Sequence, residues 1–524
     1  MRDVIILGAG HNALVAAWHL ASAGLQPLVL ERRDLVGGGA VTEEIHPGFR
    51  CSALAHACGP IHPDVVRDME LTRHGAEFIH PDPRVFAPAP DGRAIVLYND
   101  AARSAQSIAQ FSAKDAQKYP QFQEVMARIG GFLSHVLEFP PPDIDSPSAS
   151  DLWHLLQVGR GFRGLSREDM FRVLRWGPMA VADLVSEYFE TELLRATIAA
   201  RGIFGAFLGP WSAGSGTVLL LRAASDPHPA GSSCFVRGGM GRLTEAMAAA
   251  AKAAGAEIRT GAEVAQVLVK DGAATGVVLA GGEEIAAKHV ISGADPRRTF
   301  LKLLDPAHLA PDFLVKMQHY RSPGTVAKVN LALDGLPRFR ALAVANGALA
   351  GRIHIGPEID YLERAFDDSK YGNFSCAPYL EVAIPSVTDA TLAPAGKHVM
   401  SVHVQFAPYH LKESSWPEQR NALGNLVVKT LAEYAPDLPS LILARQVITP
   451  LDLEETYGFT GGHIFHGELA LDQLFTMRPL IGWARYRTPI RGLYLCGSGT
   501  HPGNGLTGLS GANAAREILK DVKK

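Results

Sequence analysis

The sequence predicts an α/β protein in which a Rossmann-like dinucleotide-binding domain is joined to a second, discontinuous α+β domain. Three observations support this fold class. Residues 1–31 follow the pattern strand, glycine-rich turn, helix and strand; a βαβ-like alternation resumes at about residue 235; and another strand, glycine turn and helix close the sequence from residue 492. A chain of 524 residues exceeds one ordinary hydrophobic core, so two domains are expected.

The first thirty-one residues carry the clearest signal. Residues 4–7 are an unbroken apolar run, typical of a parallel strand that is buried on both faces. A G-x-G-x-x-A turn follows, in which Gly8 permits the tight bend, Gly10 lets a pyrophosphate approach the backbone, and Ala13 lets the helix pack closely on the strand. Residues 12–23 are apolar almost all round, which predicts a buried helix whose N-terminal amides face the phosphates.

A carboxylate ends this unit. Glu31 follows the apolar run 28–30, where a ribose hydroxyl needs an acceptor. An acid at this position favours FAD or NAD over NADP, whose 2′-phosphate calls for a base, although Arg32 and Arg33 leave NADP open. A glycine fingerprint alone is weak evidence, but strand, helix and acid fall in register here, so dinucleotide binding is favoured over a chance glycine loop.

A second glycine run, residues 37–39, comes directly after the ribose acid and precedes Ala40 and Val41. We expect it to wrap the cofactor; an ordinary flexible loop is the alternative. Further along, residues 283–287 and 289–292 are each expected to form a strand after a helix that runs to about Ala254. The expected dinucleotide-binding domain comprises residues 1–75, 232–295 and 489–524, and the expected substrate-binding domain comprises residues 76–231 and 296–488.

Residues 202–221 raise the question of membrane insertion. They are uncharged and long enough to span a bilayer, but they hold five glycines and a proline, so a cavity wall or buried loop is expected. Their large apolar side chains would then line an apolar substrate pocket, with the ordinary core as the alternative. These side chains are Ile203, Phe204, Phe207, Leu208 and Trp211.

A second segment could contact a membrane from outside. Residues 152–176 interleave arginines with aromatic side chains, as an interfacial membrane surface does. A solvated helical lid with its aromatics in the core is the alternative, and three acids at 151, 168 and 169 favour it.

Composition excludes several classes. A net charge of −3 and a pI near 6.7 give no general attraction to nucleic acid, and 47% hydrophobic residues exclude disorder. Five scattered cysteines suit a reducing compartment, and the early first strand leaves no room for a targeting sequence, so a cytoplasmic location is expected. His463 and His466 are three residues apart, but two histidines are more often core or substrate contacts than a metal site, so no metal is expected.

Together these pieces resemble the FAD-dependent amine oxidase and phytoene desaturase superfamily, and most of all its phytoene-dehydrogenase-like group, over nearly the whole chain. The motifs that carry the resemblance are Gly10-His11-Asn12, Glu31-Arg32-Arg33, Gly37-Gly38, Ala40-Val41-Thr42-Glu43-Glu44 and Tyr494-Leu495-Cys496-Gly497-Ser498. The resemblance implies a glutathione-reductase-like FAD domain and an FAD-dependent oxidoreductase that removes hydride equivalents from a small, largely apolar organic substrate.

The same resemblance assigns the cofactor site. It places the pyrophosphate at the first glycine turn, the adenosine ribose at Glu31, and the flavin pyrimidine edge at residues 505–508. The cofactor-binding residues expected in this way are Gly8, Gly10, His11, Asn12, Ala13, Glu31, Arg32, Gly37, Gly38, Ala40, Val41, Val264, Gly293, Gly497, Ser498, Gly505, Leu506, Thr507 and Gly508. One departure matters: the superfamily often has Gly-Gly-Arg where this chain has three glycines at 37–39, so an arginine contact cannot be carried over.

Lys328, His466 and His501 are the expected catalytic residues. Residues 325–333 alternate with period two, which puts Lys328 and Asn330 on one face of a strand, toward either solvent or the flavin. In the amine oxidase branch, which this strand resembles, the matching lysine holds a water at flavin N5. Its presence favours amine- or alcohol-like oxidation over polyene desaturation, and a solvated strand lysine is the alternative.

Other functions are weighed against this one. A disulfide reductase needs a close cysteine pair and a second nucleotide-binding domain, but the nearest pair, Cys51 and Cys58, lies outside any nucleotide motif. A flavin-dependent isomerase and a non-catalytic lipid- or protein-binding member of the fold remain alternatives. Glu31 and the complete C-terminal glycine turn weigh against a non-catalytic protein. The sequence predicts no oligomeric state.

Overall fold

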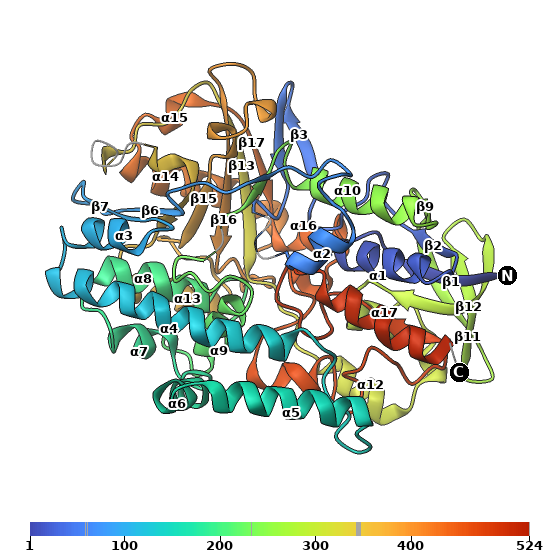
Figure 1. Cartoon of the computed structure of the whole chain (residues 1–524). Coiled ribbons are helices and arrows are strands. Elements are labelled where there is room, and N and C mark those ends of the chain that lie inside the picture. The colour runs from blue at the N-terminus through green and yellow to red at the C-terminus, as the bar shows by residue number, and fades with distance from the viewer. Residues whose placement is uncertain (58, 60, 232, 342–346, 523–524) are drawn as a thin grey trace.

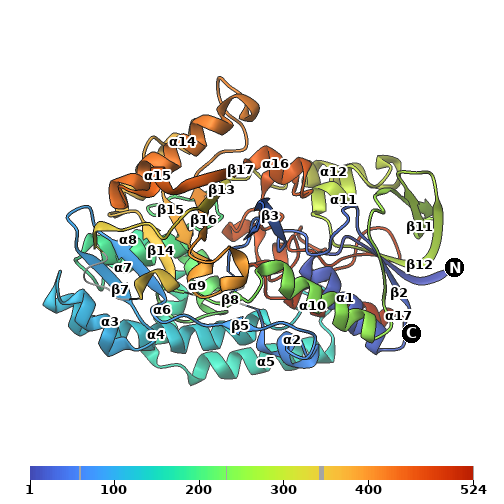
Figure 2. The same cartoon turned by 90° about the horizontal axis from the view of Figure 1, so that it is seen from above.

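The computed structural model describes residues 1–57, 59, 61–231, 233–341 and 347–522. Two large sheets dominate it, and a layer of helices runs along one side (Figures 1 and 2). Both chain ends lie at the first sheet (Figure 1). Cys58, considered above, lies outside the described residues.

The first sheet contains the strands that the sequence predicts to bind a dinucleotide. Its strand order is β10-β11-β12-β1-β2-β9, and β18 pairs with β12. The neighbours β9, β2, β1, β12 and β18 pair in parallel, whereas β10, β11 and the start of β12 form an antiparallel meander. The bounds are β1 (Arg2–Leu7), β2 (Pro27–Leu30), β9 (Glu257–Arg259), β10 (Val264–Lys270), β11 (Ala273–Leu279), β12 (Glu284–Ser292) and β18 (Leu493–Leu495). The two strands expected over 283–287 and 289–292 are one continuous strand, because different parts of β12 pair with β11 and with β1.

Both faces of this sheet are covered, which explains the apolar run in β1. Val4 and Ile6 pack in one core cluster with residues of helices α1 (His11–Ser22), α10 (Met240–Ala253) and α17 (Leu509–Val522). Ile5 and Leu7 pack on the opposite face with residues of α11 (Pro296–Leu301) and α12 (Pro311–Gln318). Helices α1 and α17 approach closely at Gly511, where a Cβ would lie 2.0 Å from the carbonyl oxygen of Asn12.

The second sheet has the order β17-β13-β16-β15-β14-β6-β7. The bounds are β6 (Val85–Pro88), β7 (Ala94–Leu97), β13 (Val326–Leu333), β14 (Arg352–Ile355), β15 (Leu380–Ala383), β16 (His398–Gln405) and β17 (Ile442–Ile448). Side chains of β13, such as Val329 and Leu331, pack against the long helix α14 (Trp416–Tyr434). Strand β13 lies between β16 and β17, so its whole length is buried. Two further sheets have two antiparallel strands each: β3 (Thr42–His46) pairs with β4 (Phe49–Ser52) as a hairpin, and β5 (Phe78–Ile79) pairs with the distant β8 (Phe235–Val236).

A helical layer extends from the second sheet below both sheets (Figure 1). Its helices are α3 (Ala101–Ile108), α4 (Ala113–Leu137), α5 (Ala149–Gly164), α6 (Arg167–Trp176), α7 (Val181–Ser186), α8 (Glu192–Ala199), α9 (Ser215–Ala223) and α13 (Ile359–Lys370). The remaining helices are α2 (Pro63–Asp68), α15 (Leu438–Leu441) and α16 (Pro450–Glu455). No helix in the described part of the chain combines the length and the apolar character that crossing a bilayer requires.

Residues 152–176 form α5 and α6, and their aromatic side chains do not all enter the core. Trp176 is 1% exposed, whereas Trp153 is 53% and Phe171 is 60% exposed. The expectation of a lid with its aromatics in the core is therefore wrong for Trp153 and Phe171. Both lie on the outer surface of the helical layer, where nothing in the described chain covers them.

Candidate active site

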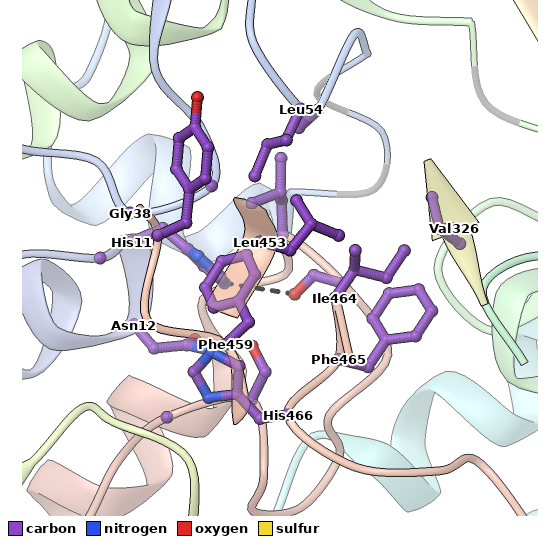
Figure 3. Close-up of a pocket in the computed structure, with 18 of the residues that line it drawn as sticks. His11, Asn12, Gly38, Leu54, Val326, Leu453, Phe459, Ile464, Phe465 and His466 are labelled. Carbon is purple, nitrogen blue, oxygen red and sulfur yellow. Dashed lines mark hydrogen bonds between the residues drawn. The ribbon is translucent and has the colours of Figure 1, made fainter. Parts of the chain in front are cut away.

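A large cavity extends from the first glycine turn to the second sheet. Its walls come from the β1–α1 turn, the loop after β4, strands β13 to β16, and the segment 453–466. Figure 3 shows one part of it, where Phe459 and His466 lie near Asn12, and Leu54, Ile464 and Phe465 contribute apolar surface. The cavity therefore joins the two sheets that the sequence assigned to different domains.

The glycine turn leaves its backbone open to this cavity. Gly8 adopts a positive φ of 85°, and Gly10 has an ordinary φ of −69°. A Cβ built on either residue would meet nothing within 4 Å, and both residues line the cavity. This open space against bare backbone, at the start of α1, fits a pyrophosphate.

Glu31 is held in place at the end of β2. Its Oε2 accepts a hydrogen bond of 2.8 Å from Ala9 N, and its Oε1 accepts one of 3.0 Å from Arg33 N. The carboxylate is buried and lines the cavity. Two backbone donors thus orient an acceptor beside the glycine turn, as binding of a ribose hydroxyl requires.

The C-terminal glycine turn meets the first one across the cavity. Asn12 Nδ2 donates to Ser498 Oγ at 3.2 Å, and His11 Nε2 donates to the carbonyl oxygen of Gly505 at 3.2 Å. Burial lowers the pKa of His11 to about 4, so its ring is neutral. These contacts join α1 to the turn before α17, so both turns can hold one extended dinucleotide.

Most of the expected site residues face the cavity. The lining includes Gly8, Gly10, His11, Asn12, Ala13, Glu31, Arg32, Gly38, Val264, Gly293, Lys328, His466, Gly497, Ser498, Gly505 and Leu506. Gly37, Ala40, Val41, Thr507, Gly508 and His501 are not part of the lining. Gly37 instead supports the turn, because it bridges Gly10 and its N–H donates to Ala9 O at 2.9 Å. The His501 ring is buried against Phe475, away from the cavity, with a centroid distance of 5.4 Å.

Lys328 projects from β13 into the cavity and is only 2% exposed. The interpretation of a solvated strand lysine is therefore wrong. Its Nζ lies 2.8 Å from Nδ1 of His56, and His56 Nε2 lies 3.1 Å from Oε1 of Glu381. Glu381 also forms an ion pair with Arg352. Because the Glu381 carboxylate accepts from Nε2, Nδ1 of the neutral ring accepts from the lysine.

The titration of this chain of contacts follows from its burial. Desolvation lowers the pKa of Lys328 to about 7 and that of His56 to about 4. Burial alone would oppose ionisation of Glu381, but the charge of Arg352 and the hydrogen bond from His56 hold its pKa well below the usual value. The cavity thus contains an amine that exchanges a proton near neutral pH and that a neutral imidazole connects to a fixed carboxylate.

Sequence patterns missed three members of this network, His56, Glu381 and Arg352. His56 lies in the loop after β4, which has no motif of its own. Arg352 and Glu381 are single charged residues in the short strands Arg-Ile-His-Ile and Leu-Glu-Val-Ala. The sequence did offer one signal for Arg352 and Glu381, a single charged residue inside an apolar strand. Such a residue is rarely buried without a partner, so it indicates a buried ion pair.

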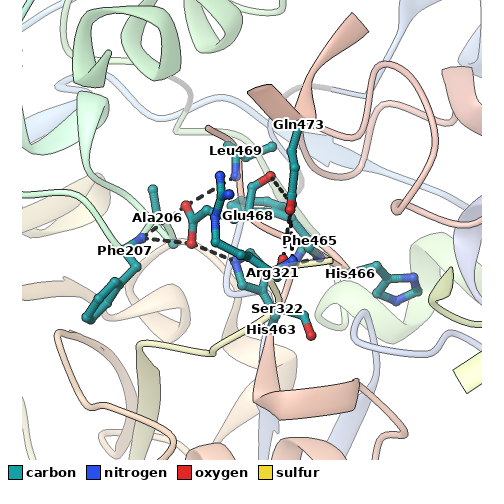
Figure 4. Close-up of polar contacts among 12 residues, drawn as sticks. Ala206, Phe207, Arg321, Ser322, His463, Phe465, His466, Glu468, Leu469 and Gln473 are labelled. Carbon is teal, nitrogen blue, oxygen red and sulfur yellow. Dashed lines mark hydrogen bonds and ion pairs between the residues drawn. The ribbon is translucent and has the colours of Figure 1, made fainter. Parts of the chain in front are cut away.

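A second polar cluster supports the wall that carries His466. Glu468 accepts backbone hydrogen bonds from Phe207 and Leu469, and its Oε2 lies 3.4 Å from His463 Nε2 (Figure 4). His463 Nδ1 accepts from Phe465 N at 3.2 Å, so its ring is tied on both sides. His466 points away from this cluster (Figure 4) and lines the cavity. His463 is therefore a structural residue of the wall, while His466 faces the site.

The cavity joins two glycine turns that fit a dinucleotide to a buried lysine whose pKa is near neutral, and this combination indicates a dinucleotide-dependent oxidoreductase. The family model described as "Flavin containing amine oxidoreductase" matches residues 14–519, and the chain belongs to this family. The chain is an FAD-dependent oxidoreductase that acts on organic substrates. The cofactor and the family expected from the sequence are confirmed.

Individual relatives agree with this assignment. The chain is 38% identical to pyridine nucleotide-disulfide oxidoreductase domain-containing protein 2 of Rattus norvegicus, over 99% of this chain and 94% of the relative. It is 26% identical to the lycopene-forming phytoene desaturase of Pantoea ananas, over 100% of this chain and 100% of that protein. The solved structure of wild-type putrescine oxidase bound to putrescine shares the fold, with a TM-score of 0.59, 18% identity, and coverage of 100% of this chain and 99% of that one.

Proposed function

We propose that this protein oxidises a small amine- or alcohol-like substrate in the cavity between the two sheets, at the point where Lys328 approaches it. The observation that carries the proposal is one continuous cavity, which joins the glycine turns to a buried lysine of pKa about 7. In this proposal residues 1–75, 232–295 and 489–524 hold FAD, and residues 76–231 and 296–488 hold the substrate. The bound flavin supplies the acceptor for a hydride equivalent from the substrate.

Lys328 would hold a proton at the reacting end of the cavity. Near neutral pH its Nζ is divided between the charged and neutral forms, which matches the requirement for a group that gives and takes a proton. His56 fixes the lysine by accepting one of its hydrogen bonds, and Glu381 fixes the ring of His56. The remaining Nζ donors are then available for a water or for the heteroatom of the substrate.

His11, His466 and the neighbouring rings would shape the site and exclude water. Burial lowers the pKa of His466 to about 4, and its Nδ1 has no hydrogen-bond partner among the described residues. The buried Nδ1 atom of His466, near the first glycine turn, is therefore available for a hydrogen bond with the cofactor. The catalytic role expected for His501 is not part of this proposal, because His501 lies outside the cavity lining.

The apolar part of the substrate would lie against Leu54, Val326, Ile464 and Phe465 (Figure 3). Of the residues that the sequence suggested for an apolar pocket, Phe204 lines the cavity, whereas Ile203, Phe207, Leu208 and Trp211 do not. The apolar surface therefore comes mainly from the 453–466 segment and from the loop after β4 rather than from residues 203–211.

Anaerobic bleaching of the purified yellow protein tests this proposal. A panel of amines, alcohols and polyenes is added in turn, and the loss of flavin absorbance is followed. Bleaching by an amine or alcohol supports the proposal, and the rate of recovery in air then separates an oxidase from a dehydrogenase. Bleaching by polyenes alone contradicts the amine- or alcohol-like assignment. A protein that converts a substrate without net bleaching is an isomerase, and one that no compound reduces or converts is a binder.

We also propose that the outer face of α5 and α6 makes peripheral contact with anionic membranes. Exposed Trp153 and Phe171 lie among exposed arginines such as Arg160 and Arg163, the combination that binds membrane interfaces. Flotation with anionic vesicles at low and moderate salt is the measurement, and Trp153→Ser with Phe171→Ser should abolish binding. Absence of the parent protein from the floating fraction at both salt concentrations contradicts this proposal. A cytoplasmic location remains a prediction.

A further inference from the structure

Three guanidinium groups line the cavity where it meets the helical layer and strand β14 of the second sheet. Arg201 comes from the single turn after α8, Arg222 from α9, and Arg352 from β14, and all three line the cavity. Arg201 and Arg352 both donate to the carbonyl oxygen of Ala230. Desolvation is the main cause that lowers the pKa of Arg201 to about 9, and the positive charges of Arg352 and Arg222 are the next largest causes. Three cations therefore share one small region.

The carboxylates of this region are already engaged. Glu381 pairs with Arg352, and Asp226 pairs with Arg84, whose Nη1 lies 2.8 Å from Oδ2 of the acid. Among the described residues, Arg201 and Arg222 have no carboxylate within ion-pair distance. Two buried or largely buried positive charges thus lack a counter-ion from the protein itself, an arrangement that costs free energy unless a ligand neutralises it.

Arg222 shows this most clearly. Its guanidinium stacks over the ring of Phe204, with 4.2 Å from Cζ to the ring centroid, and lies 5.7 Å from the centroid of Phe465. The described residues offer it no hydrogen bond, and its buried Nε is without a partner. The Phe204 ring is in turn stacked on His403 at 4.2 Å. An aromatic platform therefore holds the guanidinium while its N–H groups remain available.

We infer that Arg201 and Arg222 form a subsite for an anionic group of the substrate, with a carboxylate as the group that the paired N–H donors fit best. This inference rests on the proposed function, since it names the substrate class of the same cavity. The apolar part of such a substrate would lie over Phe204 and Phe465, and its oxidisable carbon would lie toward Lys328. The substrate is then an amphiphilic organic acid and not a simple hydrocarbon.

Matched pairs of acids and neutral amides test the subsite without knowledge of the substrate. The holoprotein is titrated with acetate, hexanoate and phenylacetate and with the corresponding amides, and the perturbation of the flavin absorbance reports binding. We expect at least one acid to bind tenfold or more tightly than its amide. Equal binding of acids and amides, or binding of neither, overturns the subsite. Phenyl phosphate is titrated as a further ligand. If phenyl phosphate binds tightly and phenylacetate does not bind, the assignment of a carboxylate as the anionic group is overturned.

Variants assign the effect to the two arginines. Arg222→Gln and Arg201→Gln should each weaken acid binding tenfold or more and change amide binding less than twofold, and Arg222→Lys should recover part of the loss. Arg73→Gln, at an exposed arginine outside the cavity, is the matched control and should bind as the parent does. If Arg222→Gln purifies with less FAD, or weakens acids and amides alike, the arginine belongs to the cofactor site or the fold, and the inference fails.

Failure of the subsite and failure of the proposed function give different results. Bleaching by a neutral amine or alcohol with no preference for acids overturns the subsite alone. A preference for acids that depends on Arg222, in a protein that no amine or alcohol reduces, overturns the proposed oxidation but keeps the anionic subsite.

Discussion

Lys328 Nζ lies 2.8 Å from His56 Nδ1, although the two residues are 272 positions apart in the sequence. The contact joins the second sheet to the loop after β4, inside the cavity that both sheets line. It places a lysine whose pKa is about 7 next to a neutral imidazole. A proton can therefore be exchanged inside the cavity near neutral pH, where an exposed lysine would stay charged.

Lys328→Met should slow flavin chemistry while FAD content stays unchanged, because methionine keeps the length and removes the charge. By analogy with loss of an oxyanion-hole donor, the effect on the rate is roughly 2 to 4 kcal/mol, or about 30- to 1,000-fold. Anaerobic flavin reduction and reoxidation in air are measured separately once a substrate is known. If both rates equal those of the parent, Lys328 is not the catalytic residue.

The same substitution should stabilise the folded protein at and below neutral pH. The pKa of Lys328 is about 7 in the fold and 10.5 in its ordinary state, so between these values the unfolded chain binds more protons and stability rises with pH. The increase in the free energy of unfolding of Lys328→Met over the parent is therefore largest below about pH 7 and becomes small toward pH 10.5. Thermal unfolding at several pH values measures it. A gain that is equal at about pH 6 and about pH 10 contradicts the buried-lysine assignment.

Glu381→Gln should destabilise the fold by about 3 to 5 kcal/mol, because it leaves the buried Arg352 guanidinium without its counter-charge. Chemical denaturation provides the measurement. Glu283→Gln, which breaks an exposed pair with Arg259 on the first sheet, is the matched control and should have little effect. Similar losses in both variants would show that Glu381 is not part of a buried network.

Gly10→Ala should fold normally and lose affinity for FAD. The φ of Gly10 is −69° and its Cβ position is open, so the protein itself accommodates a methyl group. That methyl group, however, occupies the space over the bare backbone where a pyrophosphate would lie. The ratio of flavin to protein after purification and the circular dichroism of the protein are compared with those of Gly159→Ala on α5. Full FAD content in Gly10→Ala would show that the pyrophosphate does not lie against this turn.

FAD should be bound without a covalent link. Cys496, which lies within the C-terminal motif, is fully buried, and desolvation raises the pKa of its thiol to about 12. Its side chain does not line the cavity, so it offers no thiolate to the flavin. Acid precipitation should release the yellow colour into the supernatant. Colour that stays in the pellet would show a covalent flavin.

The amino-acid sequence alone determined the dinucleotide-binding features of this protein. The turn at Gly8 and Gly10, the helix after it and the carboxylate of Glu31 depend on neighbours within about thirty residues, and each needs a specific backbone conformation or side-chain size. Requirements of this local kind can be recognised in the sequence as residue types at fixed spacings. Spacing and the sign of one charge therefore predicted a dinucleotide, FAD or NAD, and the resemblance to the amine oxidase and phytoene desaturase superfamily indicated FAD.

The tertiary structure alone decided which side chains face the cavity. Period-two alternation put Lys328 and Asn330 on one face of a strand, but only the position of β13 between β16 and β17 showed that this face is buried. Asn330 donates to Ala53 O and Gln446 Oε1 and so supports the strand, whereas Lys328 reaches His56. The partners of a buried charge come from distant parts of the chain, because desolvation is offset by whichever groups the fold brings within contact, and their spacing in the sequence is unconstrained.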